Sequence, residues 1–481
     1  MPLLVIRADA GNKISTGHVM RMLALAQAWR RRGGQSKFIT AECPQALTER
    51  ILREGFQHHS IHCTQAGDPD DASATIVQAD EWLVLDGYHF GISYQTQCRK
   101  AGLKLLCVDD FGHCDTWDCD LLLNQNLGAV PHNTTPDACL FGSSFALLRE
   151  EFLAHPRNSS PWSRINKLLI TLGGSDPPNA TAHVLTLLSL LDCVDLEIRT
   201  IIGPSNPHRD ALKTLSLPFD VQWRESVTDM PAEYAWADGV ISAGGSSCWE
   251  WLYFGLPGVV VTIAENQEPV VRELAKESLA LCPGWPSEWT DPSALSQWLE
   301  APQRSIKQDR AGSLIDGRGS DRVASAIDGS RCLIRSTDPH LDRQFTFDLV
   351  NDPSVRSAGY ATDEIPWESH CDWLERHHKS SDSHLFIIET IDQTPVGFLR
   401  FHRADAEWEI GIALTSDARG KGYADQGIRL GMSELSTRHH IHQFLATIRP
   451  TNTSSKNLFA RLGFHLKSSE DDRELWTLEL T

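Results

Sequence analysis

The strongest constraint on the fold is an alternation of short apolar runs with amphipathic helical stretches over the first two thirds of the chain. "LLVIRAD" and "EWLVLDGY" have the length of strands, and the helical pattern "GHVMRMLALAQAWRRRG" follows the first of them. Apolar runs separated by helices are typical of parallel strands whose two faces are both covered. The alternation therefore predicts α/β domains with parallel sheets.

Two breaks in this alternation predict three domains in the 481 residues. The segment 151–166 is rich in Pro, Ser and Asn and reads as a linker, after which the alternation restarts with "KLLITLGG". Near "RCLIRSTD" the rhythm changes to helices followed by adjacent strands, which indicates an α+β domain. We expect Rossmann-like domains at 1–148 and 149–330, and an α+β domain at 331–481. In the last domain we expect one helical stretch at 347–360 and one strand after the final helix.

Charge and cysteine usage exclude several classes of protein. The net charge of −19 argues against general binding of nucleic acid or anionic membranes, although one local site can still bind an anion. The 12 cysteines are scattered without a CxxC pair, which favours reduced thiols and no metal site. The start resembles no signal peptide, and no apolar run approaches the roughly 20 residues of a membrane span. We therefore expect a soluble cytoplasmic protein.

Glycine-rich turns after two strands are candidate phosphate sites. "TLGGSDP" contains Gly173, and "ISAGGSSCWEW" contains Gly245 and Ser246 and runs directly into a helix. Backbone N–H groups of such turns can approach a phosphate, although an ordinary tight turn remains an alternative. "TIAENQEP" adds polar residues 265–267 at another strand end. Neither turn matches a P-loop or GxGxxG, so ATP hydrolysis and nicotinamide binding are poorly supported.

A histidine at the start of the first helix is the main catalytic candidate. A helix N-terminus disfavours imidazolium, so His18 in "TGHVMR" is biased towards the neutral form that a general base needs. Asp86 and Tyr88 end another strand, and Asp109 with Asp110 follow the next one. In a parallel sheet these residues meet at one edge. The alternatives are a structural histidine and ordinary turn aspartates.

Five stretches in this order resemble the PseG-type UDP-sugar hydrolases of pseudaminic acid biosynthesis: "RADAGNKISTGHVMRMLALAQAW", "LDGY", "VDD", "ISAGGSSCWEWLYFGLP" and "ENQ". The resemblance spans residues 1 to about 328 and implies the two-domain GT-B fold of the MurG-like glycosyltransferases. It also implies the reaction. Water would cleave UDP from UDP-2,4-diacetamido-2,4,6-trideoxy-β-L-altropyranose with inversion at the anomeric carbon and without a metal.

The resemblance assigns roles to individual residues. It implies that His18 is the general base and that Tyr88 lies beside the sugar. The loop around Gly245 would bind the diphosphate, and Glu250 the uridine ribose. The full set of implied substrate-binding residues is Gly17, Arg21, Asp86, Gly173, Gly245, Ser246, Glu250, Asn266 and Gln267. Ser15 departs from the family, which usually has a glycine there, as in IGxGH.

A second candidate site lies in the last domain. A strand ending at Leu414 is followed by "RGKGYA", whose backbone N–H groups at 419–424 would form a nest for a pyrophosphate. A plain turn with glycines is the alternative. Downstream, "RPTNTSSKNLFARLGFH" supplies a strand, then Asn452, then a helix that ends at Gly463.

These two elements resemble the GNAT acetyltransferases over about residues 332–481. "NDPSVRSAGY" and "IPWESHCDWLERH" make the domain similar to enzymes that act on amino-sugar nucleotides. These include the PseH type, which N-acetylates UDP-4-amino-4,6-dideoxy-N-acetyl-β-L-altrosamine. Phe459 replaces the tyrosine that often serves as general acid. The implied acetyl-CoA residues are Ile412, Ala413, Arg419, Gly420, Lys421, Gly422, Tyr423, Ala424, Asn452 and Asn457.

The sequence leaves two questions open: which residue is the base of the acetyl transfer, and what the chain does as a whole. Glu407 or Glu409 would relay the amine proton, unless both are surface charges. Our main hypothesis is a bifunctional enzyme that acetylates an amino UDP-sugar and then hydrolyses off UDP. One alternative is a glycosyltransferase that passes the sugar to an acceptor. The other is a nucleotide-sugar sensor with a degenerate acetyltransferase module.

Overall fold

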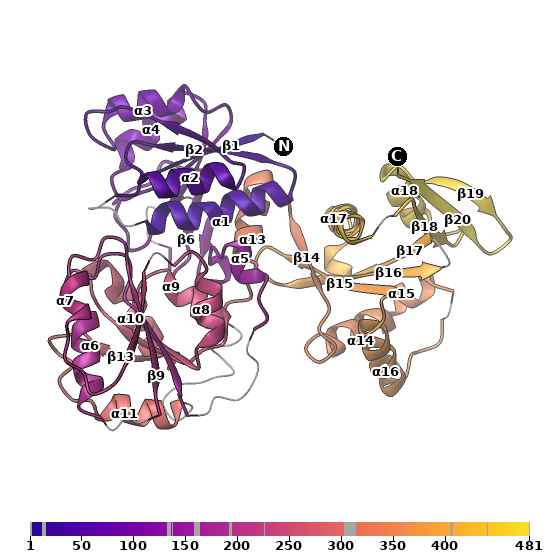
Figure 1. Cartoon of the computed structure of the whole chain (residues 1–481). Helices are drawn as coiled ribbons and strands as arrows, with labels where there is room; N and C mark the ends of the chain where they lie inside the picture. The colour runs from indigo at the N-terminus through magenta and orange to yellow at the C-terminus, as the bar shows by residue number, and fades with distance from the viewer. Residues whose placement is uncertain are drawn as a thin grey trace. The chain divides into compact units, whose positions relative to one another are not determined.

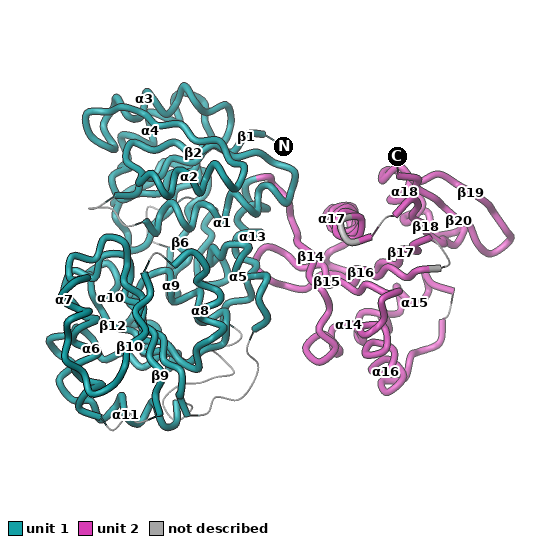
Figure 2. Tube along the Cα trace, in the orientation of Figure 1, with its two compact units in different colours: residues 1–327 teal, residues 328–481 magenta. Residues whose placement is uncertain are grey.

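The structure is a computed structural model of the full chain. It describes residues 2–11, 16–131, 136, 138–157, 164–191, 195–225, 227–302, 314–360, 362–404, 407–439 and 441–480. The chain forms two compact units, unit 1 at 1–327 and unit 2 at 328–481 (Figure 2). None of the helices within the described ranges combines the length and the hydropathy that a bilayer crossing needs.

The first lobe of unit 1 is a doubly wound parallel sheet. Its strand order, β3-β2-β1-β4-β5-β6-β7, begins with the 3-2-1-4-5-6 order of the Rossmann fold. The central strands β1, β4, β5 and β6 are largely apolar, and helices connect the successive strands from β1 to β5 (Figure 1). The strands are β1 (Leu3–Ala8), β2 (Gln35–Thr40), β3 (Gln57–Ser60), β4 (Trp82–Asp86), β5 (Lys104–Val108), β6 (Leu121–Asn124) and β7 (Cys139–Phe141). The helices are α1 (Gly17–Arg31), α2 (Gln45–Arg53), α3 (Pro69–Ile76), α4 (Ile92–Lys100) and the short η1 (Ser143–Phe145).

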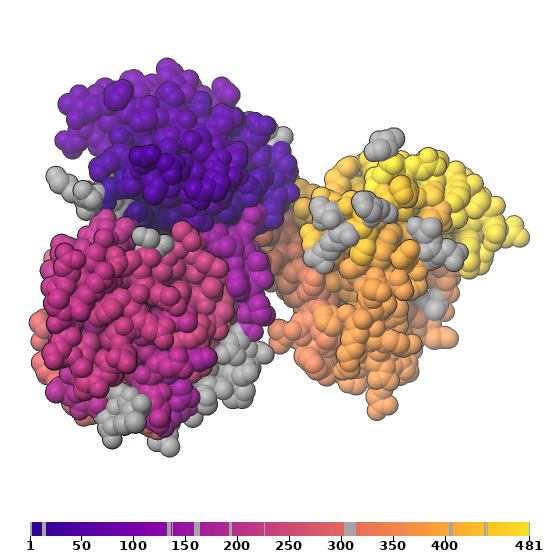
Figure 3. Space-filling view, in the orientation of Figure 1, coloured from indigo at the N-terminus to yellow at the C-terminus, as the bar shows by residue number. Residues whose placement is uncertain are grey.

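The second lobe repeats this topology, with the parallel order β10-β9-β8-β11-β12-β13. Figure 3 shows the two lobes of unit 1 as separate masses, indigo and rose, that meet along a seam. The strands are β8 (Lys167–Thr171), β9 (Glu197–Ile202), β10 (Val221–Glu225), β11 (Gly239–Ala243), β12 (Gly258–Val261) and β13 (Leu281–Gly284). The helices are α5 (Glu150–Leu153), α6 (Ala180–Ser189), α7 (Arg209–Lys213), α8 (Met230–Trp236), α9 (Ser247–Tyr253), η2 (Glu265–Gln267), α10 (Glu268–Lys276), α11 (Ser293–Glu300) and α13 (Gly319–Asp328).

Two segments tie the lobes of unit 1 together. The first part of the expected linker 151–166 is ordered structure, because Phe152 of α5 is fully buried in the core of the second lobe. Residues 158–163 of that segment lie outside the described ranges. The terminal helix α13 contacts the first lobe: Asp321 pairs with Arg31 at 2.7 Å, and Arg322 donates to the Ser144 carbonyl at 2.8 Å.

Unit 2 is built on a mixed sheet with the order β14-β15-β16-β17-β18-β20-β19. Neighbouring strands are antiparallel except β17 and β18, which are parallel. The strands are β14 (Cys332–Ser336), β15 (Ser383–Thr390), β16 (Pro395–Ala404), β17 (Glu407–Leu414), β18 (Gln443–Ile448), β19 (His465–Ser469) and β20 (Glu474–Glu479). The helices are α14 (Arg343–Asn351), α15 (Pro353–Ala358), α16 (Trp367–His378), η4 (Ser416–Ala418), α17 (Tyr423–Arg438) and α18 (Thr453–Arg461).

Two details of unit 2 correct the sequence interpretation. The expected single helical stretch at 347–360 is divided between α14 and α15, because Asp352 leaves the helical conformation immediately before Pro353. Proline disfavours helix at the preceding residue, and the Asp352 side chain then caps α15 by accepting from Ser354 N. The expected single closing strand is an antiparallel pair, β19 and β20. Parallel-sheet Rossmann-like lobes followed by a mixed-sheet domain nevertheless confirm the predicted fold class.

Candidate active sites

The polar residues of unit 1 gather where ligands of doubly wound sheets bind. In such sheets a crevice forms outside the carboxyl ends of the two central strands, where the connections turn to opposite sides. In the first lobe those strands are β1 and β4. Asp86 is the last residue of β4, and His18 lies in the first turn of α1, the helix that follows β1. In the second lobe they are β8 and β11, followed by the turns at Gly173 and Gly245.

A buried carboxylate holds the His18 imidazole. His18 Nδ1 lies 2.7 Å from Asp86 Oδ1, and Arg21 reaches both Asp86 oxygens at 2.6 and 2.7 Å. Burial alone would raise the pKa of the Asp86 carboxyl, but the charge of Arg21 and the hydrogen bonds from Arg21 and His18 outweigh burial and hold that pKa well below its usual range. An ionised carboxylate only accepts hydrogen bonds, so Nδ1 carries the donated hydrogen. Neutral His18 therefore presents Nε2 as a base.

Asp86 and Arg21 consequently lie on the Nδ1 side of the His18 ring, away from Nε2. Both side chains are buried, and Asp86 is fully so. Their polar atoms are engaged with each other, with His18 and, through Arg21 Nη1 at 2.8 Å, with Asp110. The structure thus places these two expected substrate-binding residues in positioning contacts. The link from His18 to Asp86 spans 68 positions along the chain, so the helix-terminus argument from the sequence does not include it.

Tyr88 forms the exposed wall next to His18. The two rings meet edge to face with centroids 5.0 Å apart, and the Tyr88 hydroxyl donates to Asp110 Oδ2 at 2.7 Å. Burial and the Asp110 charge raise the pKa of Tyr88, while the Asn266 side chain of the second lobe opposes the rise. Tyr88 therefore stays protonated at neutral pH, and its hydroxyl lies close to Asn266. The structure brings His18, Tyr88 and Asn266 together between the lobes.

The loop after β5 supports this wall. The Asp109 carboxylate accepts from Gly112 N at 2.8 Å and lies 3.0 Å from His113 Nδ1, which agrees with the turn role considered for Asp109. The loop carries Phe111, whose ring contacts Tyr88 with centroids 4.8 Å apart. Burial would lower the pKa of His113, but hydrogen bonding to Asp109 outweighs it and raises the pKa to about 9.

The raised pKa makes the stability of this loop depend on pH. An unfolded histidine has a pKa of about 6.5, so the folded state binds the His113 proton more tightly. The resulting stabilisation is fully present below about pH 6.5 and is lost as the pH rises through about 9. At about 1.4 kcal/mol per unit of pKa, the loss is about 3 kcal/mol at most. We expect urea unfolding of the unchanged protein to show this decrease and His113→Gln to lack it. Equal pH dependence of the two proteins would contradict the assignment.

In the second lobe, Gln267 holds the glycine turn. Its side-chain oxygen accepts from Gly244 N at 3.2 Å and from Ile263 N at 3.1 Å, so the amide faces the turn. No atom lies within 4 Å of where a Cβ would stand at Gly245, and Ser246 is exposed. Gly173, with a φ of +82° in an exposed turn, has equally open surroundings. The outer sides of both turns are therefore accessible to a ligand.

Three further residues of unit 1 that the sequence analysis singled out are Glu250, Gly17 and Ser15. Glu250 lies 3.2 Å from Arg149 Nη2, and its other oxygen accepts from the Tyr234 hydroxyl at 3.3 Å, so both oxygens are engaged. Burial raises the pKa of Glu250, against the effect of Arg149. Gly17 is the first residue of α1. Ser15 lies outside the described residues. Within the described ranges, no group of three His, Cys, Asp or Glu side chains is arranged to hold a metal ion.

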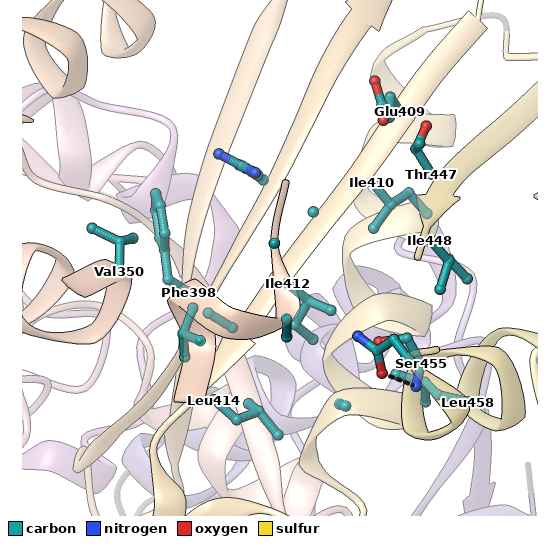
Figure 4. Close-up of a pocket in the computed structure, with 18 of the residues that line it drawn as sticks. Val350, Phe398, Glu409, Ile410, Ile412, Leu414, Thr447, Ile448, Ser455 and Leu458 are labelled. Atoms are coloured by element: carbon teal, nitrogen blue, oxygen red, sulfur yellow. Dashed lines mark hydrogen bonds between the residues drawn. The ribbon is translucent and has the colours of Figure 1, made fainter. Parts of the chain in front are cut away.

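In unit 2, the parallel pair β17 and β18 opens into a cavity. The strands pair only through Trp408 and Glu409 and then separate, although both continue. A cavity of about 1650 Å³ occupies the opening. Figure 4 shows Glu409 and Thr447 together on the two strands, with Ser455 and Leu458 of α18 elsewhere along the wall. The expected acetyl-CoA residues that line this cavity are Ile412, Ala413, Arg419, Gly420, Gly422, Ala424, Asn452 and Asn457.

The turn before α17 has the geometry of an anion-binding nest. Gly420 and Gly422 have φ values of +74° and +87°, and Gly422 immediately precedes α17. Such alternation points successive N–H groups to one side of the chain. Lys421 and Tyr423 do not line the cavity: the Lys421 carbonyl accepts from Arg331, and Tyr423 packs against the core. The Asn452 side chain caps α18, because its Oδ1 accepts from Ser455 N at 3.0 Å.

The candidate residues for proton transfer differ in whether they line the cavity. Glu409 lines the cavity, whereas Glu407 pairs with Lys467 at 3.1 Å and is not part of the lining. Phe459 is buried against Phe464 at the cavity wall and has no hydroxyl to donate. Tyr360 is the one tyrosine among the described lining residues, and sequence reasoning missed it.

Sequence reasoning also missed Arg400, which lies across the cavity floor. Arg400 on β16 is the register partner of Gly411 on β17, and a Cβ at Gly411 would lie 2.3 Å from Arg400 Nε. The glycine therefore makes room for the guanidinium. A glycine inside an apolar strand was the available signal, because it marks close approach of another group.

Comparisons with known proteins match two separate parts of the chain to known domain families. Residues 168–285 match the glycosyltransferase family 28 C-terminal domain, and residues 331–465 match the acetyltransferase (GNAT) domain. An uncharacterized protein of Methanocaldococcus jannaschii is 22% identical over 509 residues, covering 99% of both chains. The spore coat polysaccharide biosynthesis protein SpsG of Bacillus subtilis is 26% identical over 192 residues, covering 39% of this chain and 57% of that protein.

Solved structures similar to the chain align with about a third of its length. Spermidine N-acetyltransferase of Vibrio cholerae, in complex with CoA and spermine, is 16% identical with a TM-score of 0.30, covering 31% of this chain and 96% of that one. The putative acetyltransferase yncA of Salmonella typhimurium, with acetyl-CoA, is 19% identical with a TM-score of 0.28, covering 32% and 95%. The family matches support an enzyme. As the sequence indicated, the chain joins a glycosyltransferase family 28 C-terminal domain of the GT-B type to a C-terminal GNAT acetyltransferase domain, consistent with a PseG-like unit fused to a GNAT.

Proposed function

We propose that unit 1 hydrolyses a UDP-sugar and that unit 2 acetylates the amino group of its precursor. The observation that carries the hydrolase is the contact between His18 Nδ1 and buried Asp86, which leaves Nε2 as a base next to Tyr88. The open glycine turns at Gly173 and Gly245 supply backbone donors for the diphosphate. Resemblance to the PseG type names UDP-2,4-diacetamido-2,4,6-trideoxy-β-L-altropyranose as the substrate.

The hydrolysis needs one proton acceptor and a stabilised leaving group. Nε2 of His18 takes a proton from water while the water oxygen attacks the anomeric carbon. The bond from that carbon to the diphosphate oxygen breaks, and UDP leaves with the electron pair. Attack from the side opposite UDP inverts the anomeric centre. N–H groups of the turn at Gly245 bind the negative charge that develops on the diphosphate.

In unit 2 the acceptor is the 4-amino UDP-sugar and the donor is acetyl-CoA. The nest at Gly420 and Gly422 would bind the pyrophosphate of the cosubstrate, and the separation of β17 from β18 admits its thioester arm. The amine nitrogen attacks the thioester carbonyl, the carbon–sulfur bond breaks, and CoA leaves as a thiolate that takes up a proton. Glu409 accepts the amine proton, directly or through one water.

Substitution of two carboxylates on β17, Glu409 and Glu407, tests the assignment of Glu409 as the base. We expect Glu409→Gln to lower the rate of acetyl transfer by roughly 10²-fold or more, because the general base is lost. Glu407→Gln serves as the matched control, since that side chain pairs with Lys467 outside the cavity. The measurement is release of free CoA with a thiol reagent. Equal rates for the two variants would exclude Glu409 as the base.

The two reactions are consecutive, because acetylation yields the diacetamido UDP-sugar that hydrolysis consumes. Fusion of the two units raises the local concentration of this intermediate. Incubation of the full chain with the 4-amino UDP-sugar and acetyl-CoA should release CoA first and UDP after a lag. Release of UDP without prior acetylation would contradict the order.

The family 28 match favours a second candidate, a glycosyltransferase. In that case the sugar passes from UDP to an acceptor hydroxyl rather than to water, with the same base. Turnover that requires an added acceptor is the result that would establish this candidate.

A further inference from the structure

The cavity of unit 2 contains a concentration of positive charge that contrasts with the rest of the chain. The whole chain has a net charge of −19. Seven arginines and two carboxylates, Glu409 and Asp425, line the cavity. Arg419 belongs to the nest and Arg461 to α18, and the other five arginines are Arg356, Arg376, Arg400, Arg449 and Arg473. Such an excess attracts an anion into a concave site.

Arg400 lies on the face of the sheet opposite to α17, the helix that the nest precedes. Phe398 and Ala413 pack with α14 and α16 on one face of the sheet, and Arg400 shares that face because it alternates with Phe398. Ile410 and Ile428 of α17 pack on the opposite face. The nest directly precedes α17, so we expect an acceptor to enter on the face that carries Arg400.

Two of the guanidinium groups lie against the ring of Tyr360. Arg449 and Arg473 lie over the Tyr360 ring at 5.6 and 5.2 Å, and Arg449 donates to the Ser357 carbonyl at 3.4 Å. The salt bridges in the described part of unit 2 do not include Arg376, Arg400, Arg449 or Arg473. Removal from water lowers the pKa of Arg400, and nearby Glu409 opposes the fall. A bound anion would supply the missing counter-charge.

We propose that this side of the cavity binds an amine that carries a phosphate or diphosphate group, with Arg400 and Arg473 in contact with the anionic group and the amine at Glu409. The assignment rests on the proposed acetyl transfer and names the part of the acceptor that is recognised. A polycationic amine does not fit this lining, because five guanidinium groups would repel it.

The test is binding of UDP to the full chain with CoA kept saturating, followed by calorimetry. We expect two UDP sites, one in each unit. Arg400→Gln with Arg473→Gln should weaken one of them by about tenfold or more, since the charged hydrogen bonds of the two side chains together contribute at least about one order of magnitude. Arg403→Gln, on the same strand but outside the lining, should leave both sites intact. Gly245→Trp should remove the other site.

Steady-state kinetics of acetylation distinguish failure of the anion site from failure of the proposed acetyl transfer. With the 4-amino UDP-sugar, we expect the double variant to raise KM about tenfold with little change in kcat. Arg376→Gln is the second variant if the double variant unfolds. Two intact UDP sites in the arginine variants, or spermine binding at the unit 2 site in place of UDP, would overturn the proposal. UDP binding without acetylation of any amino UDP-sugar would instead refute the acetyltransferase assignment and leave the anion site standing.

Discussion

His18→Asn should abolish release of UDP while leaving acetyl transfer unchanged. The variant removes Nε2, the atom that takes the proton from water, so we expect the rate to fall by about 10²–10⁴-fold. The cavity at Glu409 and the nest at Gly420 belong to unit 2, whereas His18 belongs to unit 1. The two activities of one sample therefore serve as controls for each other. UDP and CoA are measured separately in the same reaction.

Asp86→Asn distinguishes a base that is oriented by a carboxylate from a histidine with a structural role. An amide at this position can donate to Nδ1, which favours the tautomer whose Nε2 carries the hydrogen. We expect a large loss of kcat with little change in KM, since Asp86 is fully buried behind His18. Persistent UDP release in His18→Asn would show that the base is another group.

Gly420→Trp should have the reverse effect, with loss of acetyl transfer and normal release of UDP. The indole would enter the cavity, since no atom lies within 4 Å of the position of its Cβ. It would also occupy the concave side of the nest, where the N–H groups would bind pyrophosphate. We expect the affinity for CoA, measured by calorimetry, to fall by about tenfold or more.

Gly329→Trp is the matched control for backbone strain. Its φ of +73° equals that of Gly420 within one degree, its Cβ position is equally open, and it lies in the same unit. A side chain at positive φ costs roughly 1–2 kcal/mol, and both variants carry this cost. Equal CoA affinity in the two variants would show that the nest does not bind the cosubstrate.

The fold was predictable because the patterns that indicate its strands and helices lie in short continuous stretches of the sequence. Buried strands such as "LLVIRAD" and the helix that follows are visible as periodic apolar patterns. Residues that follow β1, β4, β8 and β11 could be grouped as a candidate site because parallel strands bring their carboxyl ends to one edge. The division of α14 from α15 was missed, although Pro353 is a local signal for it.

The contacts that determine the roles of residues were not predictable in the same way. Asp86 was recognised as polar and at a strand end, but its position behind His18 depends on the register of β4 beside β1. Arg400 was missed since its contact with Gly411 depends on the register between β16 and β17. The early separation of β17 from β18 has no counterpart in the local sequence pattern. These features follow from non-local pairing.

The most direct test of the hydrolase is incubation of the full chain in H₂¹⁸O with the diacetamido UDP-sugar and no other acceptor. We expect equimolar UDP and free sugar, with ¹⁸O at the anomeric carbon and the first-formed sugar in the inverted configuration. His18→Asn should give neither product. No UDP release until an acceptor is added, or ¹⁸O found in UDP instead of the sugar, would contradict attack by water on the anomeric carbon.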